Sequence, residues 1–199
     1  RNAGLANHIY ADEWDDWFVP IVNGPFNMWY QNDEFEANMS LQGEEVYGEL
    51  FQKTFQCPSA DSKTAANNEQ GNQYTIAPNR TGTVKKIDSS ATGSGDGEEG
   101  VFVGTRRGKV PSAGNKMMYT DATGYYFVHV LSANYETVWN LWGDVNGDYS
   151  WNWSAPSYRH SEGANILFFD GHVGNMKKEY IYDVFIPESN TFLWDIGQK

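Results

Sequence analysis

The segment RHSEGANILFFDGHV, residues 159–173, has the residue types of a reactive or metal-binding site. His160 opens it, nine residues separate that histidine from Asp170-Gly171, and His172 follows. An imidazole beside a carboxylate can serve as a general base, and imidazoles are common zinc ligands. A hydrolase that uses His160, Asp170 and His172 is therefore one interpretation of this segment.

Strand geometry favours a structural interpretation. Asp-Gly between apolar runs predicts a hairpin, because a two-residue type I′ turn needs positive φ at both positions. In that hairpin Phe169 faces His172 and Leu167 faces Gly174. If the ten positions from His160 to Asp170 were fully extended, the two residues would lie roughly 33 Å apart. They can meet only if residues 161–163 fold back.

A zinc site on the two histidines would need a third ligand, and no nearby residue supplies one at a familiar spacing. We therefore expect Asp170 and Gly171 to form the turn. We expect His160 to anchor the loop before the strand through a hydrogen bond or a packing contact.

The elements that position this segment predict an α+β fold with an antiparallel sheet and long loops. Residues 1–16 predict a helix whose apolar face has near i, i+4 spacing, with Leu5, Ile9 and Tyr10 and with Ala3 and Ala6 close by. A second, short helix is predicted at residues 44–51. Strands are predicted at residues 74–77, 101–103, 116–119, 125–130 and 164–169, with a return strand from His172.

Composition limits the function classes. The formal net charge of −12 repels phosphates and anionic lipids, which excludes a nucleic-acid role. Cys57 is the single cysteine, so a CxxC zinc or redox centre is excluded. No apolar run reaches the ~18 residues of a membrane span. Because the chain begins at Arg1, inside a predicted helix, we expect a segment to precede it.

A loop near residue 146 has the start of a calcium pattern. Asp144, Asn146 and Asp148 supply oxygen ligands at positions 1, 3 and 5, as in an EF-hand loop. However, glycine occupies the fourth position, and the twelfth is Ala155, which is no ligand. The alternative is an Asn-Gly turn with solvated carboxylates. Calcium is the only metal ion that this pattern suggests.

Tryptophans surround that loop in the sequence. Their flat faces can stack on sugar rings, or they can close the core or an assembly contact; they are Trp139, Trp142, Trp151 and Trp153. The sequence leaves both interpretations open.

Other polar runs predict no catalysis. The first helix ends in an acidic run, Asp12, Glu13, Asp15 and Asp16. A carboxylate pair for glycoside hydrolysis would need a cleft, which the sequence does not show, so we expect these residues to be solvated. His8 is expected to be a surface or packing residue. The stretch at 93–100 lacks the GK[ST] of a phosphate loop.

The order of these motifs resembles the prepilin-type H-X9-DG family. Residues 159–173 are similar to its C-terminal segment, and residues 1–20 follow the register of its first helix. Cys57-Pro58-Ser59 looks like its CPS element. Val110-Pro111-Ser112 with Thr120-Asp121 looks like its PS…D element. The departures are Glu162, where the family often has glycine, and a tryptophan-rich insert near 139–153.

The resemblance implies a single pilin-like domain over residues 1–199, with 1–16 as the end of the pilin helix and 74–186 as the sheet domain. It also implies a prepilin leader that is cleaved, N-methylation and an inner-membrane anchor. The protein would be extracytoplasmic, in the periplasm or at the cell surface. In this family a cysteine often precedes the first helix, and it would pair with Cys57.

The expected function is a structural pilin-like or pseudopilin-like subunit of a type II secretion or surface-fibre assembly. Its partners would be other pilin or pseudopilin subunits. The protein itself would have no enzymatic activity and no cofactor apart from the calcium considered above. The alternative is a carbohydrate-binding surface module that uses exposed tryptophans to bind polysaccharide.

Overall fold

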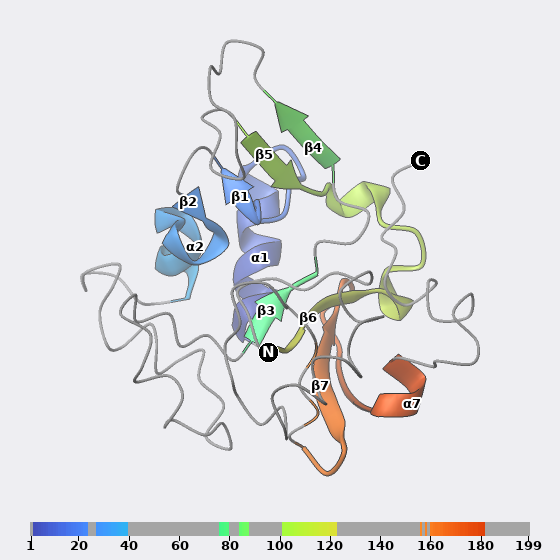
Figure 1. Cartoon of the computed structure of the whole chain (residues 1–199). Coiled ribbons are helices and arrows are strands. Elements are labelled where there is room, and N and C mark those ends of the chain that lie inside the picture. Colours follow the sequence, from blue (N-terminus) through green and yellow to red (C-terminus); the bar gives the residue numbers. More distant parts are fainter. Residues whose placement is uncertain are drawn as a thin grey trace, which may run out of the picture.

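The structure is a computed structural model that describes residues 2–23, 27–39, 76–79, 84–87, 101–122, 156, 158 and 160–181. The α-helices are α1 (Asn2–Glu13), α2 (Asp33–Asn38) and α7 (Lys178–Ile181). The strands are β1 (Val22–Asn23), β2 (Asn27–Met28), β3 (Ile76–Pro78), β4 (Val84–Ile87), β5 (Val101–Gly104), β6 (Met117–Asp121), β7 (Gly163–Phe168) and β8 (Val173–Lys177). Short 3₁₀ helices are η1 (Trp29–Gln31), η2 (Arg107–Lys109) and η3 (Ala113–Asn115). Figure 1 shows their arrangement.

The described strands form two antiparallel sheets, with strand orders β2-β1-β5-β4 and β3-β6-β7-β8. The first lies towards the top of Figure 1 and the second below it. In the first sheet, Val22 pairs with Met28 on one side and with Val103 on the other. The chain leaving α1 runs beside β5, where the Phe18 amide donates to the Thr105 carbonyl at 3.0 Å.

Strands β6 and β7 of the second sheet are buried on both faces, whereas β8 is largely exposed. Side chains of a strand alternate between the faces of a sheet. Leu167 therefore joins the core that contains Tyr10 and Tyr119. Ile166 belongs to a second core on the other face, together with Ile181 of α7. Strand β7 is thus covered from both sides.

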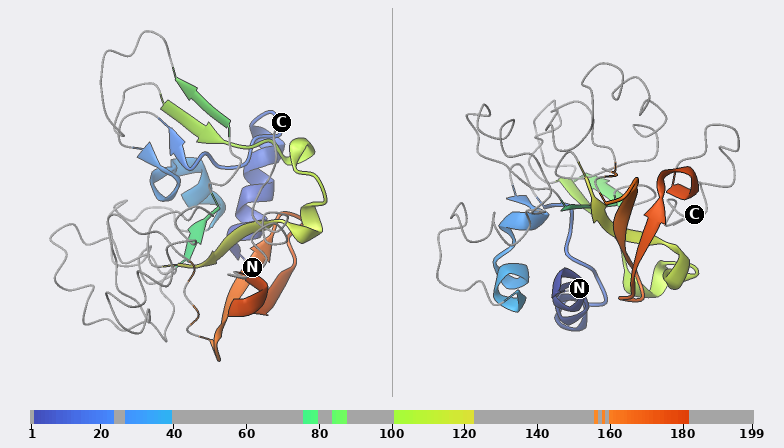
Figure 2. Two further views of the ribbon diagram at one scale, coloured as in Figure 1. Left: turned by 45° about the vertical axis from the view of Figure 1, so that its right-hand side comes forward. Right: turned by 90° about the horizontal axis from the view of Figure 1, so that it is seen from below.

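Helix α1 lies between α2 and the β7–β8 hairpin (Figures 1 and 2). Apart from Tyr10, its buried residues are small or polar; they are Gly4, Ala6, Asn7 and Ala11. A Cβ added at Gly4 would lie 2.9 Å from Leu167 Cδ1, so a side chain at this position would require Leu167 to move. Leu5, which the spacing predicts on the apolar face, is instead 64% exposed.

Asn7 connects the helix to the second sheet. Its amide nitrogen donates to the Tyr119 hydroxyl at 3.1 Å, and its amide oxygen accepts from the Val19 amide at 3.2 Å. Asn7 is 1% exposed, and these bonds satisfy a polar group that would otherwise be costly to bury. Burial also raises the pKa of Tyr119. The phenol therefore stays neutral and keeps this contact.

The α+β class with an N-terminal helix and a four-stranded antiparallel sheet is confirmed. The predicted strands at 101–103, 116–119 and 164–169 correspond to β5, β6 and β7, with shifts of one or two residues. The helix ends at Glu13, within the acidic run of residues 12–16 where its end was predicted. The predicted helix at 44–51 and strand at 125–130 lie outside the described residues. Within the described part of the chain, no helix is long and apolar enough to cross a membrane.

Candidate functional site

The Asp-Gly turn joins β7 to β8, but by a three-residue loop. The Phe168 amide donates to the His172 carbonyl, and the Gly171 amide donates back to the Phe168 carbonyl, both at 2.9 Å. Gly171 has a φ of +91°, whereas Asp170 is not among the residues with positive φ. This is a turn closed by a left-handed glycine, the second common hairpin form.

The predicted two-residue turn and its register are therefore wrong by one position. Leu167 pairs with Val173, not with Gly174. The extra loop residue is Phe169, which is 4% exposed. Its amide donates to the Lys116 carbonyl at 3.1 Å, and its ring packs 5.3 Å from that of Phe18. Burial of this ring favours the longer loop.

The two-residue turn occurs instead at the other end of β7. His160 and Gly163 exchange both backbone hydrogen bonds, at 3.1 and 3.0 Å. Between them, Ser161 and Glu162 have φ values of 53° and 63°. Positive φ at both central residues defines a type I′ turn. Residues 161–163 thus fold back, which was the condition for a contact between His160 and Asp170, but the turn does not bring those two residues together.

His160 contacts a carboxylate at the beginning of the motif. Its Nε2 lies 3.3 Å from Oδ2 of Asp121, the last residue of β6. The same oxygen accepts a 2.8 Å hydrogen bond from the Asn165 amide of β7. The Asp121 side chain is 5% exposed, so both contacts are shielded from water. His160 therefore makes a contact of the kind predicted, and its partner is Asp121.

Asp170 has a separate histidine partner. Its Oδ1 accepts from the His172 amide at 3.1 Å and lies 2.6 Å from His172 Nδ1. The His172 ring stacks on Phe168, with centroids 4.1 Å apart. Burial acts to raise the pKa of Asp170, but the hydrogen bonds from His172 outweigh it, so this pKa lies below its ordinary value.

The other oxygen of Asp170 reaches the 3₁₀ helix η3. A Cβ added at Gly114 would lie 2.8 Å from Asp170 Oδ2. Glycine at this position therefore gives the hairpin tip room to dock. The described hydrogen bonds of the Asp170 carboxylate lie within the hairpin, to His172.

These two polar clusters lie at opposite ends of β7. The six residues of the strand (Gly163–Phe168) separate them by roughly 20 Å. His160 and Asp170 therefore form no dyad, and the grouping of His160, Asp170 and His172 in one hydrolytic site is not present. Each cluster instead fixes one end of the strand.

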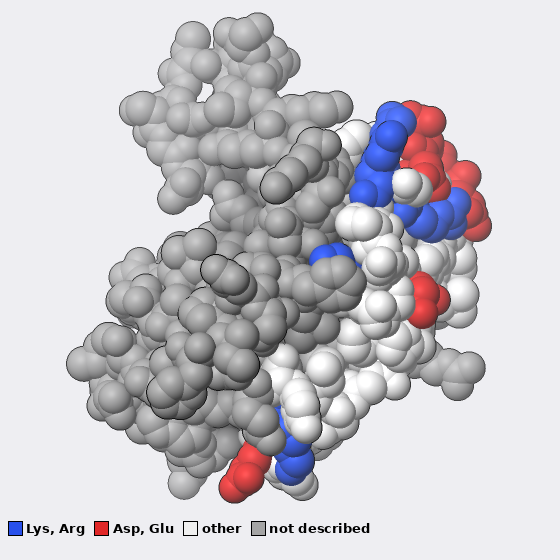
Figure 3. Space-filling view, turned by 90° about the vertical axis from the view of Figure 1, so that its right-hand side faces the viewer, with Lys and Arg blue, Asp and Glu red and all other residues white. Residues whose placement is uncertain are grey.

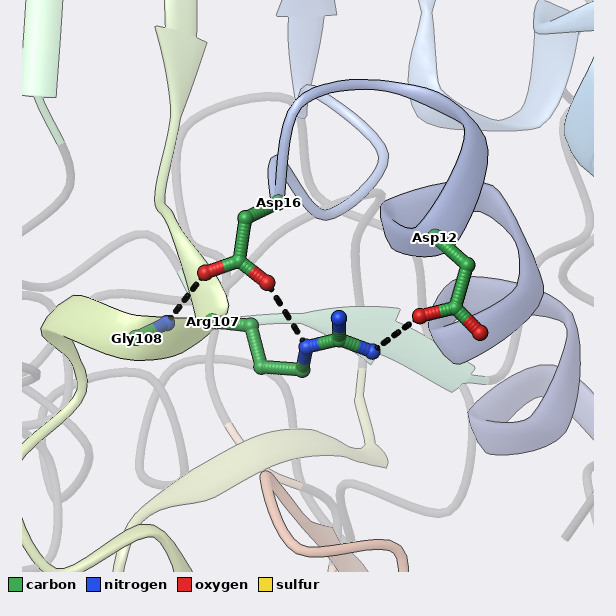
Figure 4. A network of polar contacts seen from close by, with 4 residues as sticks. All are labelled: Asp12, Asp16, Arg107 and Gly108. Carbon is green, nitrogen blue, oxygen red and sulfur yellow. Dashed lines mark hydrogen bonds and ion pairs between the residues drawn. The ribbon is translucent and has the colours of Figure 1, made fainter.

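The end of α1 carries an ion-pair network (Figure 4). Arg107 donates from Nη1 to Asp12 Oδ1 at 2.7 Å and from Nε to Asp16 Oδ1 at 2.8 Å. The Gly108 amide donates to Asp16 Oδ2 at 2.8 Å. The Gly108 amide, followed by Arg107, lowers the pKa of Asp16. The acidic helix end is in contact with solvent, with the Asp12 side chain 66% and the Asp16 side chain 38% exposed, but sequence reasoning did not predict that both aspartates are paired with Arg107.

A third aspartate of this run is also paired. Arg106 Nη2 lies 2.6 Å from Asp15 Oδ2, and the Arg106 guanidinium lies 5.0 Å from the centroid of the Trp17 ring. Figure 3 shows these acidic and basic side chains gathered at one corner of the molecule. Because Asp15 and Asp16 have φ values of 50° and 66°, the pairs also hold a strained turn.

His8 is a packing residue, as predicted. Its ring meets Phe18 edge to face with centroids 5.3 Å apart. Burial, followed by the charge of Arg107, lowers the pKa of His8. The neutral imidazole therefore suits this position between α1 and the hairpin tip, where a Cβ at Gly171 would lie 3.7 Å from His8 Nε2.

The remaining predicted site residues lie outside the described residues; they are Cys57, Trp139, Trp142, Trp151, Trp153, Asp144, Asn146 and Asp148. Among the residues that the structure does describe, no group of three or more metal-ligating side chains is close enough to hold an ion. A cavity of ≈ 20 Å³ lined by Asn7, Asn79 and Tyr119 has room for about one water molecule.

Sequence reasoning did not predict Arg106 and Arg107 as partners of the acidic run, nor Asp121 as the partner of His160. The one sequence feature that pointed to Asp121 was its place in the PS…D element.

A search against protein-family models found no match to the chain, and searches of the curated proteins and of the solved structures found none either.

Proposed function

We propose that this protein is a structural, pilin-like or pseudopilin-like subunit of a type II secretion or surface-fibre assembly. The observation that supports this best is the packing of α1 along the antiparallel sheet. Gly4 sits against Leu167, and Asn7 is hydrogen-bonded to Tyr119. In such a subunit an apolar helix assembles with its neighbours, and a sheet fixed to that helix displays the exposed domain.

The chemistry of the H-X9-DG segment supports a structural role. His160 and Asp170 are both engaged in contacts within the fold, at opposite ends of β7. A general base would need a substrate group within hydrogen-bond reach, together with partners in one pocket. The contact of His160 with Asp121 instead joins the start of β7 to β6, and that of Asp170 with His172 closes the hairpin.

In this proposal the helix continues upstream into an apolar segment that anchors the subunit in the inner membrane. The domain described here is extracytoplasmic, and its partners are other subunits of the same kind. Cys57 pairs with a cysteine just upstream of Arg1, which rigidifies the start of the domain.

The coding sequence upstream of residue 1 tests the proposal directly. We expect a short basic leader, a prepilin cleavage site and roughly 20 apolar residues that run into α1. Mass spectrometry of the mature protein should show an N-methylated first residue. A conventional secretion signal that ends beside Arg1 would refute the proposal.

A second test uses the full-length protein in its own cells. A Gly4→Val variant would push α1 away from Leu167, and we expect it to be lost from sheared fibres or secretion complexes. Glu162→Gln, at an exposed turn, is the matched control and should assemble normally. Equal recovery of the two variants at equal cellular abundance would argue against a role of helix–sheet packing in assembly.

A further inference from the structure

Trp14 presents an open aromatic face directly after α1. Its indole lies nearly parallel to the Tyr10 ring, with an interplanar angle of 9° and centroids 5.5 Å apart. Tyr10 is 5% exposed and is held in the core, while Trp14 is 47% exposed. In the described part of the chain, no other ring and no cation stacks on Trp14. One face is therefore fixed and the other is available.

The surroundings of this ring are acidic. No lysine or arginine occurs between Arg1 and Lys53. The nearby basic residues, Arg106 and Arg107, are already paired with aspartates. Among the described contacts, three exposed carboxylates of α1 and α2 have no ion pair; they are Glu13, Asp33 and Glu34.

The start of α2 lies beside the stacked rings. Helix α2 packs against α1, and its first residues are Asp33 and Glu34. Burial raises the pKa of Tyr10, and the nearby charge of Glu34 raises it further. Since α2 packs against α1 and the charge of Glu34 acts on the Tyr10 hydroxyl, Glu34 lies on the side of α1 that carries Tyr10, the stacking partner of Trp14.

The molecule already contains one example of the contact that this surface would make. Trp17 follows Trp14 by three residues, and the Arg106 guanidinium lies 5.0 Å from the centroid of its ring. The Nη2 atom of the same guanidinium pairs with Asp15 at 2.6 Å. An indole face and a carboxylate hold one guanidinium between them. Cation–π contacts are strongest with tryptophan, and arginine makes them more often than lysine.

We propose that Trp14, Glu13, Asp33 and Glu34 form a docking surface for an arginine-containing segment of a partner protein. The guanidinium stacks on the open face of Trp14 and pairs with the free carboxylates, as Arg106 does with Trp17 and Asp15. The negative net charge of the chain steers such a segment towards this surface. This inference does not depend on the assembly role proposed above.

The test is a titration of the ¹⁵N-labelled protein with acetyl-Gly-Arg-Gly-Arg-Gly-amide, followed by NMR. The matched control ligand replaces both arginines with citrulline, which keeps the shape and removes the charge. The chain has 8 tryptophans, so the Trp14 indole signal is assigned as the one missing from Trp14→Leu. Cellohexaose is titrated separately.

We expect the arginine peptide to shift the Trp14 indole and the Glu34 amide, and the citrulline peptide to leave both in place. Trp14→Leu should weaken binding about two- to fivefold, as an exposed cation–π contact predicts. The control variant Tyr180→Leu, which removes a 65% exposed aromatic elsewhere, should bind normally.

Three results would overturn the proposal. Shifts spread evenly over the acidic surface and unchanged by Trp14→Leu would indicate unspecific charge attraction. Equal shifts with the citrulline peptide would remove the role of the cation. A stronger response of Trp14 to cellohexaose would assign this face to sugar stacking.

Discussion

The contact between His160 and Asp121 should contribute a measurable coupling energy. We consider the variants His160→Ala, Asp121→Ala and the double variant. A hydrogen bond to a charged, buried group contributes about 1.5–3 kcal/mol. The 3.3 Å separation is long, and the His160 side chain is 28% exposed. We therefore expect a coupling energy of about 1 kcal/mol.

The single variants should differ in cost. Asp121→Ala also removes the acceptor of the Asn165 amide, so it should lower the free energy of unfolding by about 2–3 kcal/mol. His160→Ala removes one contact and should cost about 1 kcal/mol. The double variant should therefore cost less than the sum of the two.

The assay is urea unfolding of the four proteins, followed by tryptophan fluorescence. The slope of the unfolding free energy against urea must stay constant, so that the changes report on the folded state. A coupling energy below about 0.3 kcal/mol would mean that the two side chains act independently. In that case the anchoring role of His160 would be refuted.

Three further changes test other parts of the fold. Glu162→Gly should raise the unfolding free energy by about 0.5–1 kcal/mol, because Glu162 has a φ of 63°; an unchanged urea midpoint would argue against strain at this turn. Gly163→Ala should lower the free energy of unfolding by about 1–3 kcal/mol, since its Cβ would lie 2.6 Å from the Met176 carbonyl oxygen. The control Gly174→Ala, whose Cβ would have its nearest contact at 3.5 Å, should leave the free energy of unfolding nearly unchanged in the same assay. Burial, followed by the charge of Asp33, raises the pKa of Glu36 to about 7, so stability should fall as the pH rises from about 4.5 to 7. Urea unfolding at pH 5 and at pH 8 should show a loss of unfolding free energy on the order of 2–3 kcal/mol, and Glu36→Gln should remove this loss.

The pH prediction has a definite sign. A carboxyl whose pKa is higher in the folded state binds its proton more tightly there, so protonation stabilises the fold. Stability is highest below the ordinary pKa and declines until the folded-state pKa is passed. A loss on acidification over the same range, in the wild type but not in Glu36→Gln, would contradict this account.

Local sequence signals located the hairpin but not its details. Asp-Gly suits a two-residue turn and also the longer loop that occurs here. The choice depends on the burial of Phe169 against Phe18, which brings together residues far apart in the sequence. The apolar spacing of α1 correctly predicted Ala6 and Tyr10 as buried, but it misplaced Leu5, which is exposed, because Gly4 makes the contact with Leu167.

Charge pairing was harder to predict. The acidic run at residues 12–16 gives no local sign of its partners, since Arg107 is 91 positions from Asp16. His160 was predicted to be an anchor from strand geometry, which is a local argument. Its partner Asp121 lies on a neighbouring strand, and only the three-dimensional pairing of β6 and β7 brings the two together.

The contacts of α1 also determine the order of events during synthesis. Asn7 bonds to Tyr119, 112 positions later, and Asp12 bonds to Arg107, 95 positions later. The helix therefore leaves the ribosome long before the strands that cover it exist, and docking must wait for β6 and β7. Such distant pairing slows folding and leaves the buried face of α1 open in the meantime. Helix α1 is synthesised before β6 and β7 and docks on them late, so a nascent chain stalled before residue 119 would present that face to chaperones.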